Sequence, residues 1–265
     1  MIIFAINKCI IMATFLFDNI IFGPVKSRRL GNSLGINLLP TNAKFCTFNC
    51  VYCECGWNSK GVKIELPRLG DIVPAMEKYF SENTQPLDVI TFAGNGEPTI
   101  NPDFPEIVAE TVRLRDKYMP NVKISVLTNA SNLKNDRVVA ALKMIDEPIL
   151  KIDTFIQPDF ELINQPVSGL SIASIVDDIA KNFANPIIQT MFMRGNINGK
   201  LFDNTTSESI SMYYDTLKRL KPSLVMVYSI ARETPLSGLH NVAPDELERI
   251  GNDIRALGFK VLVTP

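Results

Sequence analysis

Four of the five cysteines lie within one ten-residue segment, and their spacing is the strongest chemical signal in the chain. The five are Cys9, Cys46, Cys50, Cys53 and Cys55. A disulfide framework would spread its cysteines along the chain, so this cluster predicts reduced thiolates that bind a metal in a cytoplasmic protein. The first three cysteines of the cluster read C-x3-C-x2-C.

Three thiolates in one loop can each bind one iron of a cubane cluster, which normally takes four cysteine ligands. The fourth iron is then open to a small molecule. If the backbone is extended after Cys53, alternation points Cys55 away from the iron and leaves that position free. The alternative is a zinc site with Cys55 as fourth ligand, in a non-catalytic adaptor, although the Cys53-x-Cys55 spacing is tighter than is usual for zinc.

A glycine-rich segment and several polar residues follow other predicted strands. Gly94-Asn95-Gly96-Glu97-Pro98-Thr99 comes directly after an apolar run, and its glycines let the backbone approach a ligand. Asn129 and Asp153 end the next two predicted strands, and Gln189 and Arg194 belong to the strand after those. Because ligands of parallel sheets bind at the carboxyl ends of the strands, these residues are predicted to surround one site.

Arginines supply further candidate binding groups. Arg194 and Arg232, at the exits of two predicted strands, can bind a carboxylate or phosphate, or pair with Glu233 or Asp153. The run Lys26-Ser27-Arg28-Arg29 is the only compact basic stretch, and it also has the composition of a solvated loop. The net charge is −1, so no global attraction to nucleic acid is expected.

An alternation of β-rich and helical patterns predicts the elements that position these residues. Strands are expected over residues 35–39, 88–93, 123–128, 149–153, 186–192, 224–230 and, at an edge, 260–263. Helices are expected over 68–82, 103–118, 132–146, 171–184, 206–220 and 244–257, with Asn132 and Ser171 at two starts and Gly258 after the last. The alternation predicts an α/β protein with a parallel sheet. A partial (β/α)6 TIM-like barrel fits best, and a doubly wound sheet is the other option.

Length and composition are those of a globular protein, with 265 residues, 46% hydrophobic and 21% charged. The apolar start is interrupted by Asn7 and Lys8, lacks a cleavage site, and is too short and polar to span a membrane. Met12 offers a second start, so residues 1–11 are expected to be a minor leader or a misassigned start. We expect an N-terminal extension over residues 1–20, one domain over residues 21–265, and no membrane partner.

The cysteine triplet, with the aromatic Tyr52 before its last cysteine, resembles the radical S-adenosylmethionine (SAM) superfamily. The resemblance implies that Cys46, Cys50 and Cys53 bind one four-iron four-sulfur (4Fe-4S) cluster. It also implies that the open iron chelates the amino and carboxylate groups of SAM. An electron from the cluster then cleaves the sulfonium and yields a 5′-deoxyadenosyl radical, which abstracts a hydrogen atom from the substrate.

The same resemblance implies roles for the other polar positions. Gly94, Gly96, Glu97 and Pro98 match the family's Gly-Gly-Glu-Pro element, whose backbone receives the SAM amino group, although Asn95 stands between the two glycines. The family implies Tyr52 as an adenine neighbour, and residues at the strand exits as ligands of the ribose or the methionine carboxylate. The cofactor-binding set is therefore predicted to include Asn129, Asp153, Gln189 and Arg194. Phe45, Phe48 and Trp57 are expected to shield the cluster from water.

The resemblance covers most of residues 21–240 and implies an oxidoreductase-like enzyme with a reducing partner such as flavodoxin or ferredoxin. The basic run and Ser33-Leu34-Gly35 are similar to the subgroup related to the tRNA wyosine-base synthases. Those enzymes carry a second cluster, for which this chain has only Cys9 and Cys55 to spare. The substrate therefore stays open between a tRNA base and a protein or peptide.

Overall fold

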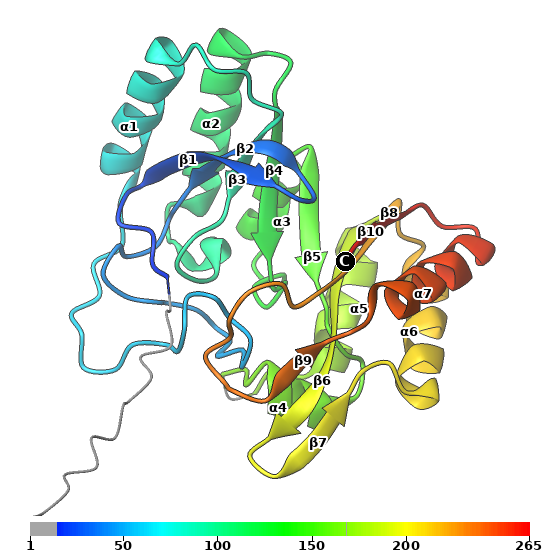
Figure 1. Ribbon diagram of the computed structural model, residues 1–265. Helices are drawn as coiled ribbons and strands as arrows, with labels where there is room; N and C mark the ends of the chain where they lie inside the picture. Colours follow the sequence, from blue (N-terminus) through cyan, green and yellow to red (C-terminus); the bar gives the residue numbers. More distant parts are fainter. Residues whose placement is uncertain (1–14, 168) are drawn as a thin grey trace, which may run out of the picture.

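The apolar runs of the sequence form the strands of one sheet in the computed structural model, which describes residues 15–167 and 169–265 (Figure 1). Cys9 and the expected leader lie outside the described residues. The strands are β1 (Ile21–Ser27), β2 (Gly31–Ile36), β3 (Val89–Phe92), β4 (Lys123–Thr128), β5 (Glu147–Lys151), β6 (Ile187–Ile197), β7 (Lys200–Asp203), β8 (Leu224–Ser229), β9 (Leu239–Asn241) and β10 (Val261–Thr264). The helices are α1 (Leu69–Glu82), η1 (Pro98–Ile100), α2 (Phe104–Tyr118), α3 (Asp136–Leu142), α4 (Gln157–Ile163), α5 (Ile172–Asn182), α6 (Ser207–Leu220) and α7 (Pro244–Ala256).

The strand order confirms the α/β class and the partial barrel. The order is β1-β2-β3-β4-β5-β6-β8-β10, with β7 and β9 paired to β6. All neighbours from β2 to β10 along this path are parallel, and β1 is antiparallel to β2. The strands follow chain order in one direction, whereas a doubly wound sheet reverses its order at a switch point. The doubly wound option is therefore wrong, and the sheet curls as a half-barrel (Figure 1).

Alternate residues of each strand separate a helix-covered face from a polar inner face. Ile90 and Phe92 of β3 lie in the main apolar core, packed with residues of α1, α2 and α5. Between them, the side chain of Thr91 points to the other face, where its hydroxyl lies 2.8 Å from that of Ser33 on β2. The inner face of the curled sheet is therefore partly polar, which suits it to line a ligand site.

Most predicted helices are confirmed, and their boundaries follow local capping. Ser171 caps α5, since its hydroxyl accepts from Ser174 N at 3.1 Å, and Gly258 follows α7 with φ +92°. The predicted start at Asn132 is wrong, because Asn135 caps α3 and Asn132 instead donates to the Thr99 carbonyl. The elements β1, α4, β7 and β9 were not predicted. In the described part of the chain, no helix combines the length and the hydropathy required to cross a membrane.

Candidate active site

The cysteine segment lies across the carboxyl ends of the strands, as the sequence predicted, and backbone contacts fix it there. It belongs to the long connection between β2 and α1. Phe45 forms a β-bridge with Gly96, just beyond β3. Asn49 N donates to the Asn164 carbonyl at 2.9 Å, just beyond α4. The loop is therefore attached to two separate parts of the barrel, one on each side of the cysteines.

Two of the predicted cluster ligands receive N–H groups from their surroundings. The sulfur of Cys46 accepts from Phe48 N at 3.4 Å and from Asn129 Nδ2 at 3.6 Å. The sulfur of Cys50 accepts from Asn164 Nδ2 at 3.4 Å. Burial raises the pKa of both thiols, and the Phe48 N–H at Cys46 and the Asn164 amide at Cys50 act against this rise by stabilising the thiolate that a metal requires.

The backbone after Cys53 is not extended, which was the condition for predicting that Cys55 points away from the iron; the direction of Cys55 relative to an iron stays a prediction. The chain turns here instead of extending, because Gly56 N donates to the Cys53 carbonyl at 2.8 Å. The turn brings the two thiols together, and a hydrogen bond from Cys55 lowers the pKa of Cys53 to about 6. The Cys55 sulfur also lies 3.4 Å from the Gly94 carbonyl, so it connects the cysteine turn to the glycine-rich loop.

The donor groups of this loop fit an iron–sulfur cluster. Buried Lys44 donates to the Gly56 carbonyl at 2.8 Å and places a positive charge beside the thiols. Within residues 15–167 and 169–265, no three His, Cys, Asp or Glu side chains converge on one metal ion. A cubane binds each cysteine through a different iron, whereas a mononuclear zinc site requires its ligands to converge. Three cysteine thiols on one short loop are a donor set that a cubane can take through three different irons.

The aromatic residues expected to shield the cluster differ in burial. Phe48 is buried and packs edge-on against Phe160, and Phe45 is half-buried. Trp57 is exposed over 40% of its surface, and its shielding of the cluster stays a prediction.

Asn95, the departure from the Gly-Gly-Glu-Pro pattern, fastens the start of the described chain to the glycine-rich loop. Its side chain is fully buried. The carbonyl oxygen accepts from Phe17 N, and the amide donates to the carbonyls of Phe17 (2.9 Å) and Pro40 (2.8 Å). Pro98 follows as the first residue of η1. The substitution thus has a packing role that a glycine could not perform.

Glu97 is buried, and its carboxylate accepts hydrogen bonds from neighbouring residues of the protein. One oxygen accepts from the hydroxyls of Thr99 and Thr128, each at 2.6 Å, and the other accepts from Asn129 N at 2.7 Å. Burial raises the pKa of Glu97, and these hydrogen bonds oppose the rise. The carboxylate therefore holds the end of β4 and orients Asn129, whose amide also donates to Thr47 at 2.9 Å.

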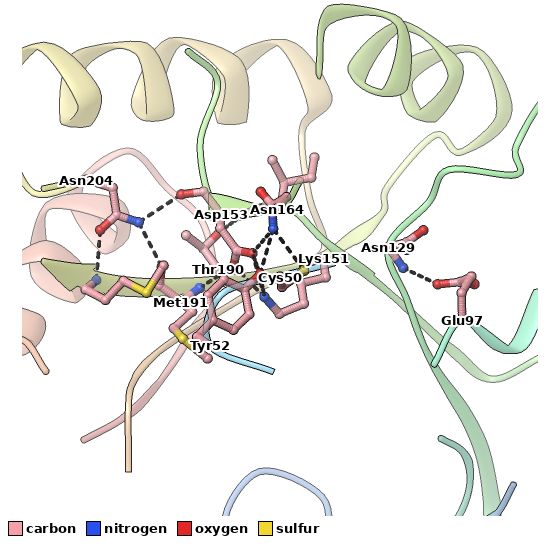
Figure 2. Close-up of polar contacts among 12 residues, drawn as sticks. Cys50, Tyr52, Glu97, Asn129, Lys151, Asp153, Asn164, Thr190, Met191 and Asn204 are labelled. Atoms are coloured by element: carbon pink, nitrogen blue, oxygen red, sulfur yellow. Dashed lines mark hydrogen bonds and ion pairs between the residues drawn. The ribbon is translucent and has the colours of Figure 1, made fainter. Parts of the chain in front are cut away.

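A buried network joins the cysteine loop to the end of β5 (Figure 2). Lys151 Nζ lies 2.7 and 2.6 Å from the two oxygens of Asp153 and 2.8 Å from the Tyr52 hydroxyl. That hydroxyl donates to Asp153 and accepts from Asn164 Nδ2 at 2.7 Å. Met191 N donates to Asp153 at 3.0 Å. Burial acts to lower the pKa of Lys151, but the Asp153 carboxylate outweighs it and the pKa is raised.

The network occupies groups that were predicted to meet SAM. The hydroxyl of Tyr52 is used by the network, and Lys151 Nζ lies 4.3 Å from the centre of its ring. A cavity of about 30 Å³ lies among Cys50, Asn129 and the network, with room for about one water molecule. It is too small for a nucleoside. The adenine contact of Tyr52 stays a prediction.

The two remaining predicted cofactor residues, Gln189 and Arg194, make their side-chain contacts with residues other than the cysteines. Gln189 is on the inner face of β6, opposite Lys151, with its amide 3.8 Å from the Met226 sulfur. Arg194 lies farther along β6 and pairs with Glu246 at 2.7 Å and Asp203 at 3.2 Å. Arg232 pairs instead with Glu54 of the cysteine loop. Neither arginine takes the pairing partners expected from the sequence.

Residues 43–155 match the sequence model of the Radical SAM superfamily. A UPF0026 protein of Synechocystis sp. is 31% identical over 240 residues, which are 88% of this chain and 80% of that protein. This chain belongs to the UPF0026 family. A UPF0026 protein of Methanocaldococcus jannaschii is 32% identical over 210 residues, covering 77% of this chain and 61% of that protein. The GTPase Obg of Brachyspira hyodysenteriae is 27% identical over 86% of this chain but 32% of that protein. The UPF0026 chain thus spans about one third of the Obg relative.

Solved structures show the fold of this UPF0026 protein. Streptococcus suis SuiB bound to S-adenosylmethionine has a TM-score of 0.61 at 15% identity, over 87% of this chain and 50% of SuiB. A radical SAM methyltransferase from Sphaerobacter thermophilus also has a TM-score of 0.61, at 16% identity, over 88% of this chain and 65% of that one. The fold is that of radical SAM enzymes. The resemblance to wyosine-base synthases stays a prediction.

The sequence analysis did not predict three residues of this site, which are Lys44, Lys151 and Asn164. The Lys151-x-Asp153 spacing was a usable signal, because residues two apart on a strand share a face. Asn164 carried no signal, because it follows α4, which was not predicted. Lys44 lay two residues before the first cysteine and reads as an ordinary surface lysine until the turn at Gly56 buries it.

Proposed function

We propose that this protein is a radical SAM enzyme that binds one 4Fe-4S cluster through Cys46, Cys50 and Cys53 and cleaves SAM reductively. The C-x3-C-x2-C loop, held across the strand ends of a radical SAM fold, is the observation that carries the proposal. When bound, the cluster would supply the electron that cleaves the sulfonium and produces a 5′-deoxyadenosyl radical.

The protein's own residues hold and insulate this centre. Asn129 and Asn164 donate N–H groups to the Cys46 and Cys50 sulfurs, which stabilises their thiolate forms. The network of Tyr52 and Asp153 connects the same loop to β5. Glu97 orients Asn129 without offering its own carboxylate to a ligand. The glycine-rich backbone between Gly94 and Gly96 is the proposed receiver of the SAM amino group.

Iron content and SAM cleavage test the proposal together. We expect the anaerobically reconstituted protein to contain about four irons per chain and to release 5′-deoxyadenosine under reduction. Cys46→Ala, Cys50→Ala and Cys53→Ala are each expected to lose the cluster and the cleavage, because each removes one of three thiolates. Cys55→Ser is the matched control and is expected to keep both. Full iron and full cleavage in any of the three alanine variants would contradict the assignment.

The second candidate is a zinc-binding, non-catalytic adaptor. It is favoured by one observation, the turn closed by Gly56 N on the Cys53 carbonyl at 2.8 Å, which keeps a fourth cysteine, Cys55, in the same turn as the triplet's last member. Metal analysis separates the two candidates. Iron with a brown absorbance supports the enzyme, whereas one zinc per chain that is lost in Cys55→Ser supports the adaptor.

For the substrate, we propose a hydrogen abstraction from either a tRNA base or a protein or peptide, with flavodoxin or ferredoxin as electron donor. The two substrate classes separate in an anaerobic assay in which 5′-deoxyadenosine release is measured with each candidate present. About eight irons per chain would revive the two-cluster chemistry of the wyosine-base synthases.

A further inference from the structure

Arg29 lies in the turn between β1 and β2, where the basic run of the sequence meets the other side of the curled sheet. In Figure 1 this turn points toward the C-terminal end of the chain. Arg28 Nη1 donates to the Pro265 carbonyl at 2.5 Å. Arg29 places its guanidinium 4.1 Å from the centre of the Tyr228 ring on β8. The turn therefore spans the gap between the β1–β2 edge and the β8–β10 edge.

The guanidinium of Arg29 has no acceptor among residues 15–167 and 169–265. No carboxylate of these residues lies within ion-pair distance, and none of its N–H groups makes a hydrogen bond there. The acidic residue that acts on it, Glu54, is already paired with Arg232. Stacking on Tyr228 leaves the N–H groups at the rim of the guanidinium free. Burial lowers the pKa of Arg29, as expected for a cation without a close anion.

The free guanidinium lies on the same inner wall as the candidate active site. The ring of Tyr228 that it covers is 6.0 Å from Lys151 Nζ, and Lys151 binds Tyr52 of the cysteine loop. Lys151 has its own carboxylate partner in Asp153. Of the two cations near the Tyr228 ring, Arg29 and Lys151, only Lys151 has a carboxylate partner among the described residues.

We propose that Arg29, held against Tyr228, binds a carboxylate or phosphate group of the substrate at the edge of the barrel interior. The guanidinium is suited to such a group because two of its N–H donors match two oxygens of one anion. The inference rests on the proposed function in one respect, that the reaction takes place at this barrel mouth. It adds that the substrate is anionic and that its anionic group is recognised from the β1–β2 turn.

Calorimetric titration of the anaerobically reconstituted protein tests this, with inorganic phosphate and acetate as separate probes. We expect saturable binding of at least one probe, and the tighter probe identifies the substrate's group. Arg29→Gln is expected to weaken the binding of that probe at least about tenfold, as for a lost charged hydrogen bond. Arg29→Lys should be intermediate, because it keeps the charge but not the planar fork. Arg28→Gln, one residue earlier, is the matched control and should bind as the wild type does.

Three results would overturn the proposal: no saturable binding to the wild type, equal affinity in Arg29→Gln, or an equal loss in Arg28→Gln. Displacement of the probe by SAM would also overturn it, because Arg29 would then serve the cofactor. Tyr228→Leu removes the stacking ring while keeping the charge, so a weakened probe in that variant supports the site independently of how Arg29→Gln folds. Failure of the proposed function would give a different result from failure of the Arg29 site. In the first case SAM is not cleaved, but probe binding still depends on Arg29.

Discussion

The Asp153 carboxylate at the barrel mouth is held by one cation and several hydrogen-bond donors. The Asp153 carboxyl, 4% exposed, faces Lys151, Tyr52 and Asn164 and also accepts from a backbone N–H. Removing one partner from such a pair leaves the other charge buried without compensation, which costs more than the pair contributes as a whole. Asp153 is therefore expected to contribute to stability through these contacts.

Asp153→Ala is expected to lower the free energy of unfolding by about 3 kcal/mol, because it strands the Lys151 ammonium. The double variant Asp153→Ala with Lys151→Met should recover part of this loss. Urea denaturation of the wild type, both single variants and the double variant measures the coupling. If the two single losses simply add, the pair is not energetically linked.

The same Asp153→Ala variant is expected to weaken SAM binding about ten- to a hundredfold while its iron content stays unchanged. The reason is that the carboxylate stands at the end of β5, where it can also accept a ligand hydroxyl. Titration with SAM, together with iron quantification, measures both quantities. Equal SAM affinity in the variant and the wild type would mean that Asp153 pairs with Lys151 and does not bind SAM.

Cys53 is expected to be the most reactive thiol of the metal-free protein at neutral pH. Its pKa is lowered to about 6, chiefly by the hydrogen bond from Cys55, whereas burial raises the pKa of Cys46. Its alkylation rate should therefore fall as the pH drops below about 6. In Cys55→Ala this midpoint should move upward. Peptide mass spectrometry after iodoacetamide treatment follows each thiol, and an unchanged midpoint would show that Cys55 does not act on Cys53.

Loops, and not the strands themselves, decide where the cysteines lie. The Phe45–Gly96 bridge ties the cysteine loop to the loop after β3, and Asn49 ties it to the end of α4. Leu236 N, beyond β8, donates to the Val51 carbonyl at 3.3 Å. Elements far apart in the chain therefore fix one short segment, and a change in any of them is expected to move the thiols.

Gly96→Ala is expected to destabilise the protein more than a glycine replacement without neighbours. At Gly96 a Cβ would lie 1.8 Å from the Phe45 carbonyl oxygen, and φ is +146°. Gly61 is the matched control, since its φ is +70° and nothing lies within 4 Å of an added Cβ. Gly61→Ala should cost about 1 kcal/mol from backbone strain alone. Denaturation of both variants provides the comparison, and equal losses would mean that the loops separate without cost.

At the scale of the whole molecule, the first described residues pack against the cysteine loop at the mouth of the barrel. Phe15 N donates to the Glu54 carbonyl in the cysteine loop, and Phe17 stacks on Phe22 of β1. Phe22 in turn covers Gly35 of β2, where an added Cβ would lie 2.0 Å from its ring. A segment from the predicted extension over residues 1–20 therefore helps to hold the loop that carries the cysteines.

Asn95→Ala tests this long-range connection. We expect it to lower the free energy of unfolding by about 2 kcal/mol or more, because it leaves buried backbone groups of Phe17 and Pro40 without partners. Asn252→Ala on the exposed side of α7 is the control and should stay within about 0.5 kcal/mol of the wild type. Thermal and urea denaturation measure both variants. A loss no larger than that of the control would mean that residues 15–17 are held by other contacts.

The barrel and the cysteine triplet could be predicted from the amino-acid sequence alone. Continuous apolar strands and amphipathic helices have periods that can be read locally, and C-x3-C-x2-C lies within eight residues, so neither needs distant information. Six strands and six helices overlap the predicted ranges, although β2 covers Gly31–Ile36 where residues 35–39 were predicted, and α3 covers only Asp136–Leu142 of the predicted 132–146. Strands β7 and β9 were missed, since they are short and form only by pairing with β6.

Which polar groups contact one another could be learned only from the folded chain. The turn at Gly56 set Cys55 beside Cys53, and α4 delivered Asn164 to Tyr52 across 112 positions of sequence. Arg29 reached Tyr228 because the curled sheet brings its two edges together. Such contacts depend on loop geometry and sheet curvature, which no local periodicity encodes, because they are set by the packing of the whole chain.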